Sequence, residues 1–401
     1  MRITELETIR VSAFPNLIFV RLYTDEKVVG LGETFYGAEA VEAHLHSVVA
    51  GYLLGEDPLK LERHSEQLAG YVGFRGSGVE TRSRSAVDIA LWDILGQVTG
   101  QPVFNLLGGQ TRPDIAIYNT CAGAGYVNSA SGQAVGNWGV KQGRYEDLYA
   151  AIHHPGKLAR DLLDQGIRGM KVWPFDAYAE RSAGHYISSA DLNEALARIA
   201  EIRDAVGGEM EIMVELHALW DVPSARKIVH ALEEFEPMWV EDPVRSDIVG
   251  GLQHVAADTP LRIAAGETVG GIADFQTLLA QRALGVVTVD TTWSGGLTTA
   301  RKVADIAAAH GIPIAPHDCT GPVALTACVH LSAAASNALI QETVRAAYLG
   351  WYSTLVEGGA SIAAGRVQAP SEPGLGVRLL PDLADRPGSV RRTSRLPKNG
   401  K

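Results

Sequence analysis

Three glutamates in the middle of the chain, Glu215, Glu241 and Glu267, follow one another at intervals of 26 residues. Each stands at the end of a short apolar run, and each interval has room for one strand and one helix. Side chains at the same end of successive parallel strands meet, so we expect these carboxylates to converge. Three carboxylates that meet cannot all stay ionised without a cation. The spacing therefore predicts a divalent metal with oxygen ligands: Mg²⁺ first, because few protein ligands leave room for water and substrate oxygens, with Mn²⁺ as a substitute.

Other charged residues stand at the ends of neighbouring apolar runs. Asp290, His317 and Glu342 continue the series at intervals of 23, 27 and 25 residues, and Lys171 precedes it. One such residue is ordinary, since helix N-termini favour Asp. Seven successive strand ends of this kind instead predict one common site. His217 lies close to it in sequence, but one histidine among three glutamates does not make a zinc site.

The first 112 residues are predicted to form an α+β domain. Short runs rich in apolar or β-branched residues at Ile3–Ser12, Leu17–Thr24 and Val28–Glu33 indicate a three-stranded antiparallel meander. Residues 38–112 have mostly helical spacing, with a glycine-rich loop at 70–78 before a long amphipathic helix.

Residues 113–355 alternate between strand and helix patterns, which indicates a parallel (β/α)8-type barrel. A doubly wound open sheet is the structural alternative, but the GxGxxG that it would want after an early strand does not occur. In a barrel the active site lies at the carboxyl ends of the strands. The expected strands are Ile115–Thr120, Gly169–Trp173, Glu211–Leu216, Met238–Glu241, Arg262–Ala265, Val286–Asp290, Pro313–Ala315 and Ala338–Gln341.

Composition excludes several classes of function. The formal net charge of −11 over 401 residues argues against a nucleic-acid-binding surface. Residues 384–401 carry six Lys or Arg against one Asp, and we interpret them as a basic, flexible, solvated tail. There is no apolar leader and no 18-residue uncharged apolar run, so neither export nor a membrane span is expected. The three cysteines, Cys121, Cys319 and Cys328, form no CxxC pair, which fits reduced thiols in a cytoplasmic protein.

The order Lys, Glu, Glu, Glu, Asp, His, Glu resembles the enolase superfamily, and within it the mandelate racemase subgroup. Nearly the whole chain takes part in the resemblance. It implies a modified (β/α)7β barrel, an N-terminal capping domain, and a segment at 356–383 that returns to that domain. The local motifs that match are Gly32-Glu33, Asp88–Asp93, Leu106–Gly109, Val240–Pro243, Gly266-Glu267 and Ala315–His317.

The resemblance implies a role for each residue of the series. The three glutamates hold Mg²⁺, which binds the substrate carboxylate, and His317 with Asp290 forms a general-base dyad. Glu342 hydrogen-bonds the carboxylate oxygen as it becomes an enediolate, and Lys171 stands near the same group. A proton next to a carboxylate is very weakly acidic, so Mg²⁺, Lys171 and a protonated Glu342 are expected to stabilise the developing charge.

Two differences from the family pattern limit the reactions that we expect of this chain. Many relatives carry Lys-x-Lys on the second strand, but here the second position is Trp173, which cannot accept a proton. Racemisation or epimerisation, which needs a base on each face, is therefore a minor option. Glu215-x-His217 is similar to the Asp-x-His of galactonate dehydratase-like members, where the histidine protonates the leaving 3-hydroxyl. We assign His217 that role. The alternatives are that His217 supports the metal ligands from behind or that it binds hydroxyl groups of the substrate.

Substrate contacts are expected from the capping domain and from Trp173. The first loop, with Phe14, is short and leaves room for a polyhydroxy chain. The glycine-rich loop offers Tyr71 and Arg75, and Arg75 could meet a distal hydroxyl or carboxylate or could simply be a surface arginine.

These patterns favour a sugar-acid (aldonate or aldarate) dehydratase that forms a 2-keto-3-deoxy acid. A sugar-lactone or anhydro-sugar cycloisomerase uses the same half-reaction and stays open. A relative that only binds would lack a key group, and a barrel metallohydrolase would need His-x-His where Thr120-Cys121 stand. The expected partners are a small sugar acid and further copies of the chain, as a dimer or octamer.

Overall fold

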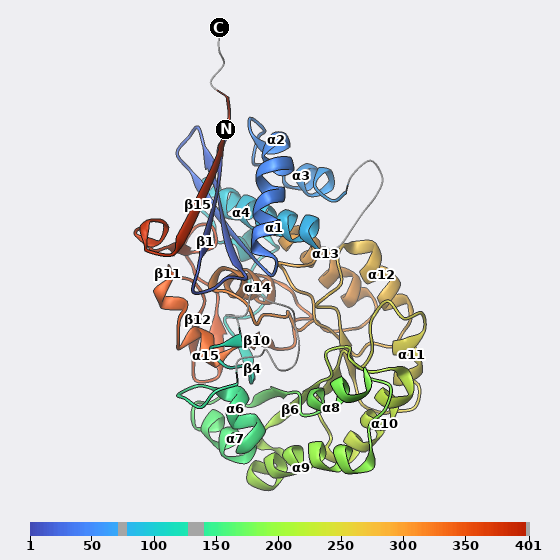
Figure 1. Cartoon of the computed structure of the whole chain (residues 1–401). Helices are drawn as coiled ribbons and strands as arrows, with labels where there is room; N and C mark the ends of the chain where they lie inside the picture. Colours follow the sequence, from blue (N-terminus) through green and yellow to red (C-terminus); the bar gives the residue numbers. More distant parts are fainter. Residues whose placement is uncertain (71–77, 127–139, 398–401) are drawn as a thin grey trace.

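The computed structural model describes residues 1–70, 78–126 and 140–397. An antiparallel sheet with helices on one face makes up the N-terminal domain, and strands ringed by helices form a barrel-like domain beside it (Figure 1). Among the described residues, no helix is both long and apolar enough to cross a membrane.

The N-terminal sheet rests on the long helix α4, and two glycines of β3 allow the contact. A Cβ atom on Gly30 would lie 2.1 Å from the Ala90 carbonyl oxygen, and one on Gly32 would lie 1.9 Å from that of Ala86. Any side chain there would push the helix off the sheet. The elements of this domain are β1 (Ile3–Val11), β2 (Leu17–Thr24), β3 (Val29–Phe35), α1 (Ala38–His44), α2 (Ala50–Leu53), α3 (Leu61–Gln67), α4 (Val79–Thr99) and α5 (Val103–Leu106).

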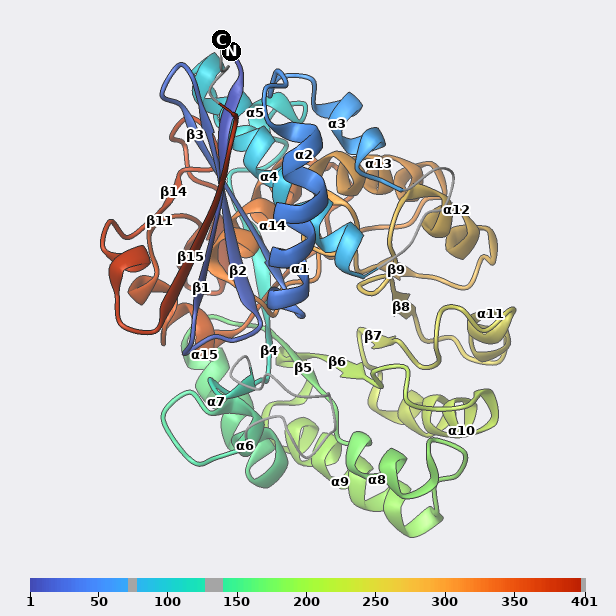
Figure 2. The same ribbon diagram turned by 45° about the horizontal axis from the view of Figure 1, so that its top comes forward.

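The sheet has a fourth strand that the sequence did not reveal. Strand β15 (Ser389–Arg395) pairs antiparallel with β1, and the two lie side by side in Figure 2. Arg395 binds Glu5 with Nε 2.6 Å from the carboxylate, and Arg391 binds the buried Glu7. The prediction of a flexible tail over residues 384–401 is therefore wrong for this segment. Two of its arginines are paired across strands with acids almost 400 positions away, which local charge counting cannot detect.

Six parallel strands of the second domain pair in chain order, from β4 to β9, and β10 returns to pair with β4. The strand predicted at Pro313–Ala315 appears only as isolated bridges from Ile314 to Val287 and to Ala338. The last predicted strand is displaced toward the C-terminus, since β10 begins at Gln341. The strands are β4 (Ile115–Thr120), β5 (Gly169–Val172), β6 (Glu211–Glu215), β7 (Trp239–Glu241), β8 (Ile263–Ala265), β9 (Val286–Val287) and β10 (Gln341–Thr343).

Helices surround these strands (Figures 1 and 2). Two of them begin with recognisable N-terminal caps: Ser188 accepts the backbone N–H of Asp191, and Asp221 accepts that of Ser224. The helices are α6 (Asp147–His153), α7 (Pro155–Asp164), α8 (Asp176–Ala179), α9 (Ser189–Val206), α10 (Val222–Leu232), α11 (Gly251–Ala256), α12 (Ile272–Ala280), α13 (Gly296–Ala309), α14 (Pro322–Ala334) and α15 (Arg345–Tyr348).

The C-terminal segment touches both domains. Strand β13 (Arg366–Gln368) pairs antiparallel with β4, while the backbone N–H of Leu375 donates to Asp93 of α4 at 2.8 Å. Asp93 also accepts the backbone N–H of Leu31 at 2.9 Å. One buried carboxylate thus ties this segment to the sheet and helix of the N-terminal domain. The remaining strands are β11 (Val356–Gly358), β12 (Ser361–Ala363) and β14 (Val377–Leu379).

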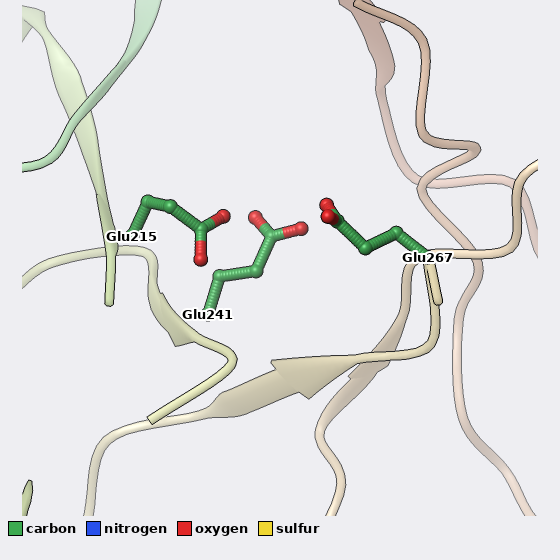
Figure 3. Close-up of side chains that lie close together, drawn as sticks. All are labelled: Glu215, Glu241 and Glu267. Carbon is green, nitrogen blue, oxygen red and sulfur yellow. The ribbon is translucent and has the colours of Figure 1, made fainter. Parts of the chain in front are cut away.

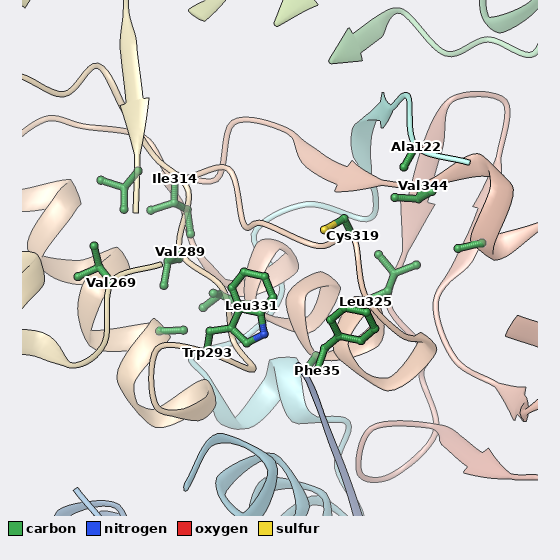
Figure 4. Packing of buried hydrophobic residues seen from close by; sticks show 14 of the residues in the cluster. Phe35, Ala122, Val269, Val289, Trp293, Ile314, Cys319, Leu325, Leu331 and Val344 are labelled. Atoms are coloured by element: carbon green, nitrogen blue, oxygen red, sulfur yellow. The ribbon is translucent and has the colours of Figure 1, made fainter. Parts of the chain in front are cut away.

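Two more buried carboxylates join the N-terminal domain to the barrel. Glu33 accepts backbone N–H groups at the start of α14, from Val323 at 3.0 Å and Ala324 at 3.3 Å. Asp88 accepts the backbone N–H of Thr298 near the start of α13 at 2.9 Å. Helix N-termini favour such negative charges. Apolar packing continues across the same junction, with Phe35 of β3 among barrel residues (Figure 4).

Candidate active site

Glu215 and Glu241 end strands β6 and β7, and Glu267 follows β8. The first two are register partners in the parallel sheet, which brings their side chains to one level. One carboxylate oxygen from each of the three lies within 4.8 Å of the other two. The three carboxylates point toward a common region, with Glu241 in the middle (Figure 3). The predicted convergence is therefore present.

The donor set fits a hard divalent cation. Glu241 is fully buried, and its Oε1 has no hydrogen-bond partner in the part of the chain that the structure describes. Burial raises its pKa to about 8, although the Lys171 ammonium opposes the shift. A carboxylate that is costly to ionise and has a free buried oxygen is suited to a cation. All the oxygens are carboxylate oxygens, which favours Mg²⁺ or Mn²⁺ over zinc.

Lys171, in β5, connects this cluster to Glu342, in β10. Its Nζ lies 2.9 Å from Glu342, 3.1 Å from Glu241 and 3.3 Å from Glu215. Burial by itself lowers the pKa of Lys171, but the surrounding carboxylates outweigh it and hold the pKa well above the ordinary value. The side chain is thus a fixed positive charge beside the glutamates.

Asp290 and His317 form a dyad. His317 Nδ1 donates to Asp290 Oδ2 at 2.7 Å, while Asp290 Oδ1 accepts backbone N–H groups from Thr292 and Trp293 at 2.5 and 2.9 Å. These bonds fix the imidazole orientation and leave Nε2 facing the cluster, 3.3 Å from Glu267. The arrangement is that of a general base held by a carboxylate.

Cys319 was missing from the expected site. Its Sγ lies 3.3 Å from His317 Nε2, and the residue is buried. The only sequence indication was its position two residues after His317. Burial raises the pKa of the thiol despite the nearby imidazole, so Cys319 is a neutral neighbour of His317.

Glu342 differs from expectation in its protonation. It accepts a hydrogen bond from the Thr120 hydroxyl and another from the Asp318 backbone N–H at 2.9 Å. Burial raises its pKa, but the charges of Lys171 and His317 outweigh that effect and lower the pKa to about 2. The direction of this shift favours the ionised form of Glu342 in the site without substrate, whereas the sequence led us to expect a protonated Glu342. The contact with Lys171, which causes the shift, was not visible in the sequence.

His217 has a carboxylate partner of its own, Asp176. Its Nδ1 lies 2.7 Å from Asp176 Oδ2, and its backbone N–H donates to Glu215 at 2.7 Å. Burial lowers the pKa of His217, but Asp176 and Glu215 outweigh it and raise the pKa to about 9. The backbone is left-handed at His217, with φ of 48°. Asp176, at the start of α8, was not predicted, because nothing in its local sequence links it to His217.

The predicted substrate contacts fall into three groups. Trp173 packs edge-on against His217, with ring centroids 5.5 Å apart. Phe14 stacks on Trp351 at 4.4 Å. Tyr71 and Arg75 lie outside the residues that the structure describes. Substrate binding by these four residues stays a prediction.

Two family models match the chain in succession. Residues 8–108 match the N-terminal domain of mandelate racemase and muconate lactonizing enzyme, and residues 156–383 match the enolase C-terminal domain-like family. Together they span the two domains described above.

Relatives found by sequence agree with these matches. The D-galactonate dehydratase of Ralstonia nicotianae is 30% identical over 387 residues, which cover 94% of this chain and 92% of that protein. That of Xanthomonas oryzae pv. oryzae is 29% identical, over 96% and 94% respectively.

Solved structures are similar over almost the full length. An enolase of the mandelate racemase subgroup from Agrobacterium tumefaciens is 44% identical, with a TM-score of 0.88 over 98% of this chain and 99% of that one. An enolase protein from Sargasso Sea environmental sequencing is 40% identical with the same TM-score, over 99% and 100%. The chain belongs to the enolase superfamily, in its mandelate racemase subgroup.

Proposed function

We propose that this enzyme is a Mg²⁺-dependent sugar-acid dehydratase, a hydro-lyase that converts an aldonate or aldarate into a 2-keto-3-deoxy acid and water. The observation that carries the proposal is a pair of histidines, each held at Nδ1 by a buried aspartate at 2.7 Å. His317 adjoins Glu267 and His217 adjoins Glu215, at opposite ends of the row of glutamates (Figure 3). Dehydration needs one group that removes a proton and another that supplies one.

Glu215, Glu241 and Glu267 are the residues that would hold Mg²⁺. When bound, Mg²⁺ would supply positive charge to a substrate carboxylate as that group becomes an enediolate. Lys171 adds a second positive charge from the side of Glu342. Both charges act in a buried setting, where they stabilise developing negative charge more than in water.

His317 acts first in the proposed sequence. Its Nε2 removes the proton from C2, and the electron pair of the C–H bond passes into the enediolate. Asp290 holds the proton on Nδ1. Burial lowers the pKa of His317, but Glu267 and the neighbouring groups outweigh it and hold the pKa well above its ordinary value. A divalent cation held by the glutamates would oppose that effect and leave Nε2 available to the substrate. Asp290 also stabilises the imidazolium that forms.

His217 completes the elimination. It donates a proton to the 3-hydroxyl as the C3–O bond breaks, and the electron pair of the enediolate forms the C2–C3 double bond. Water leaves, and the enol tautomerises to the 2-keto-3-deoxy acid. Asp176 keeps His217 protonated by raising its pKa, as a general acid requires.

The relatives support the proposal of a dehydratase, since the two reported above are D-galactonate dehydratases at 29–30% identity. Trp173 stands where a second base would be needed, which argues against racemisation. A cycloisomerase, with a ring oxygen as leaving group, would use the same histidines and is therefore included in the test below.

A substrate screen tests the proposed function. Purified enzyme with Mg²⁺ is incubated with mono- and diacid sugars, and 2-keto acids are detected with semicarbazide. We expect a keto product from at least one open-chain acid. If lactones or anhydro acids turn over while no open-chain acid gives a keto product, the dehydratase assignment is wrong.

Glu241→Gln is expected to weaken Mg²⁺ binding on the order of 100-fold, because it removes the central charged oxygen donor. Isothermal titration of the metal into wild type and variant measures the two dissociation constants. Glu357→Gln, at an exposed position in β11, is the matched control. An unchanged dissociation constant in Glu241→Gln would contradict the assignment of the metal ligands.

A further inference from the structure

Arg82 is a cation of the N-terminal domain that lies beside the proposed active site. It belongs to the first turn of α4, and its guanidinium carbon lies 5.5 Å from the centre of the Trp293 ring. The same indole lies 5.0 Å from the His317 ring. One aromatic side chain therefore separates Arg82 from the proposed base.

In the part of the chain that the structure describes, this cation has no carboxylate partner. Among the described residues no acid lies within ion-pair distance of Arg82, and its buried Nε has no hydrogen-bond partner. The segments outside the description, 71–77, 127–139 and 398–401, contain no Asp or Glu side chain. Its nearest acidic influence is Asp290, whose two oxygens already bind His317, Thr292 and Trp293.

Leaving a guanidinium partly buried and unpaired costs free energy. Burial lowers the pKa of Arg82, and the Asp290 carboxylate and the Tyr36 phenol only partly oppose the shift. The fork of Arg donors matches a carboxylate in a bidentate manner. An anionic group supplied from outside would satisfy this side chain.

Tyr36 packs against the same tryptophan, Trp293. It follows β3 with φ of 69°, a left-handed conformation that is costly for an aromatic residue, and its ring lies 5.4 Å from Trp293. The strained backbone places the ring against the indole. Three elements distant in sequence, β3, α4 and the segment after β9, thus converge beside the base.

We infer that Arg82 receives the distal carboxylate of the substrate, so that the enzyme acts on sugar diacids in preference to sugar monoacids. This inference rests on the proposed function and adds the substrate class to it. In a six-carbon diacid, four carbon–carbon bonds separate C2 from the distal carboxylate. With C2 at His317, the distal carboxylate would have to pass the Trp293 ring to meet Arg82.

The test compares matched substrates in matched variants. Six-carbon sugar diacids and the monoacids of the same configuration are assayed with wild type, Arg82→Gln and Arg82→Lys. We expect wild type to prefer a diacid. Arg82→Gln should lower kcat/KM for that diacid on the order of 100-fold, mainly through KM, and that for the monoacid less than about 3-fold. Arg82→Lys should restore part of the diacid activity, because it keeps the charge. Arg301→Gln, a barrel-surface arginine paired with Glu62, is the control.

Two outcomes would overturn the inference while leaving the dehydratase assignment intact. One is a wild-type enzyme that dehydrates monoacids but not diacids, and the other is an equal loss on both classes in Arg82→Gln. If no acid of either class is dehydrated, the proposed function has failed, and calorimetric binding decides the inference separately. Tighter binding of the diacid than of the monoacid, lost in Arg82→Gln, supports it; equal binding contradicts it.

Discussion

Replacing His317 with asparagine is expected to abolish dehydration and exchange of the substrate C2 proton together, each by roughly 10³- to 10⁴-fold. Both processes begin with the same proton transfer, and asparagine cannot accept the proton. The carboxamide retains a group that can hydrogen-bond toward Asp290. The glutamate cluster is unchanged, so Mg²⁺ should bind with little loss of affinity.

Proton NMR in D₂O measures the exchange, and calorimetry measures the metal affinity of the same sample. His254→Asn, at an exposed position in α11, controls for loss of an imidazole elsewhere on the barrel. Retained C2 exchange in His317→Asn would refute His317 as the base. Loss of metal binding together with activity would instead place His317 in the metal site.

The residues at the strand ends could be predicted because their spacing is a property of the fold. Each strand-plus-helix unit has a similar length, so Glu215, Glu241 and Glu267 recur at equal intervals and arrive at one place. Hydrophobic runs locate the strands even where pairing is short, as at Ile314, which makes only isolated bridges. Periodicity thus carries the information about the common site.

The partners of these residues could not be predicted, because they come from loops and from the other domain. Asp176 reaches His217 from the start of α8, and Arg82 reaches Trp293 from α4. Strand β15 was missed for a similar reason: its arginines indicate a tail until Glu5 and Glu7 are seen opposite them. Contacts of this kind depend on tertiary structure and leave no local pattern.

The pair of His217 and Asp176 predicts that Asp176→Asn will separate removal of the C2 proton from loss of the 3-hydroxyl. Asp176 touches His217, while His317, the proposed base, has its own aspartate. Exchange of the C2 proton should therefore stay within about 3-fold of wild type, whereas dehydration falls by roughly 10²- to 10³-fold, because the general acid loses its charge and orientation. Asp247→Asn, on the surface, is the control.

The pH dependence of Asp176→Asn distinguishes this role from a purely structural one. Asp176 and Glu215 raise the pKa of His217 to about 9 against the effect of burial. A general acid works below its pKa, so the wild-type dehydration rate should decline only as pH rises through about 9. Without Asp176 the pKa falls toward or below the ordinary value of about 6.5, and the decline should begin at correspondingly lower pH. A variant that loses exchange and dehydration equally, with the alkaline limb unmoved, would show that Asp176 supports the fold and not the proton donor.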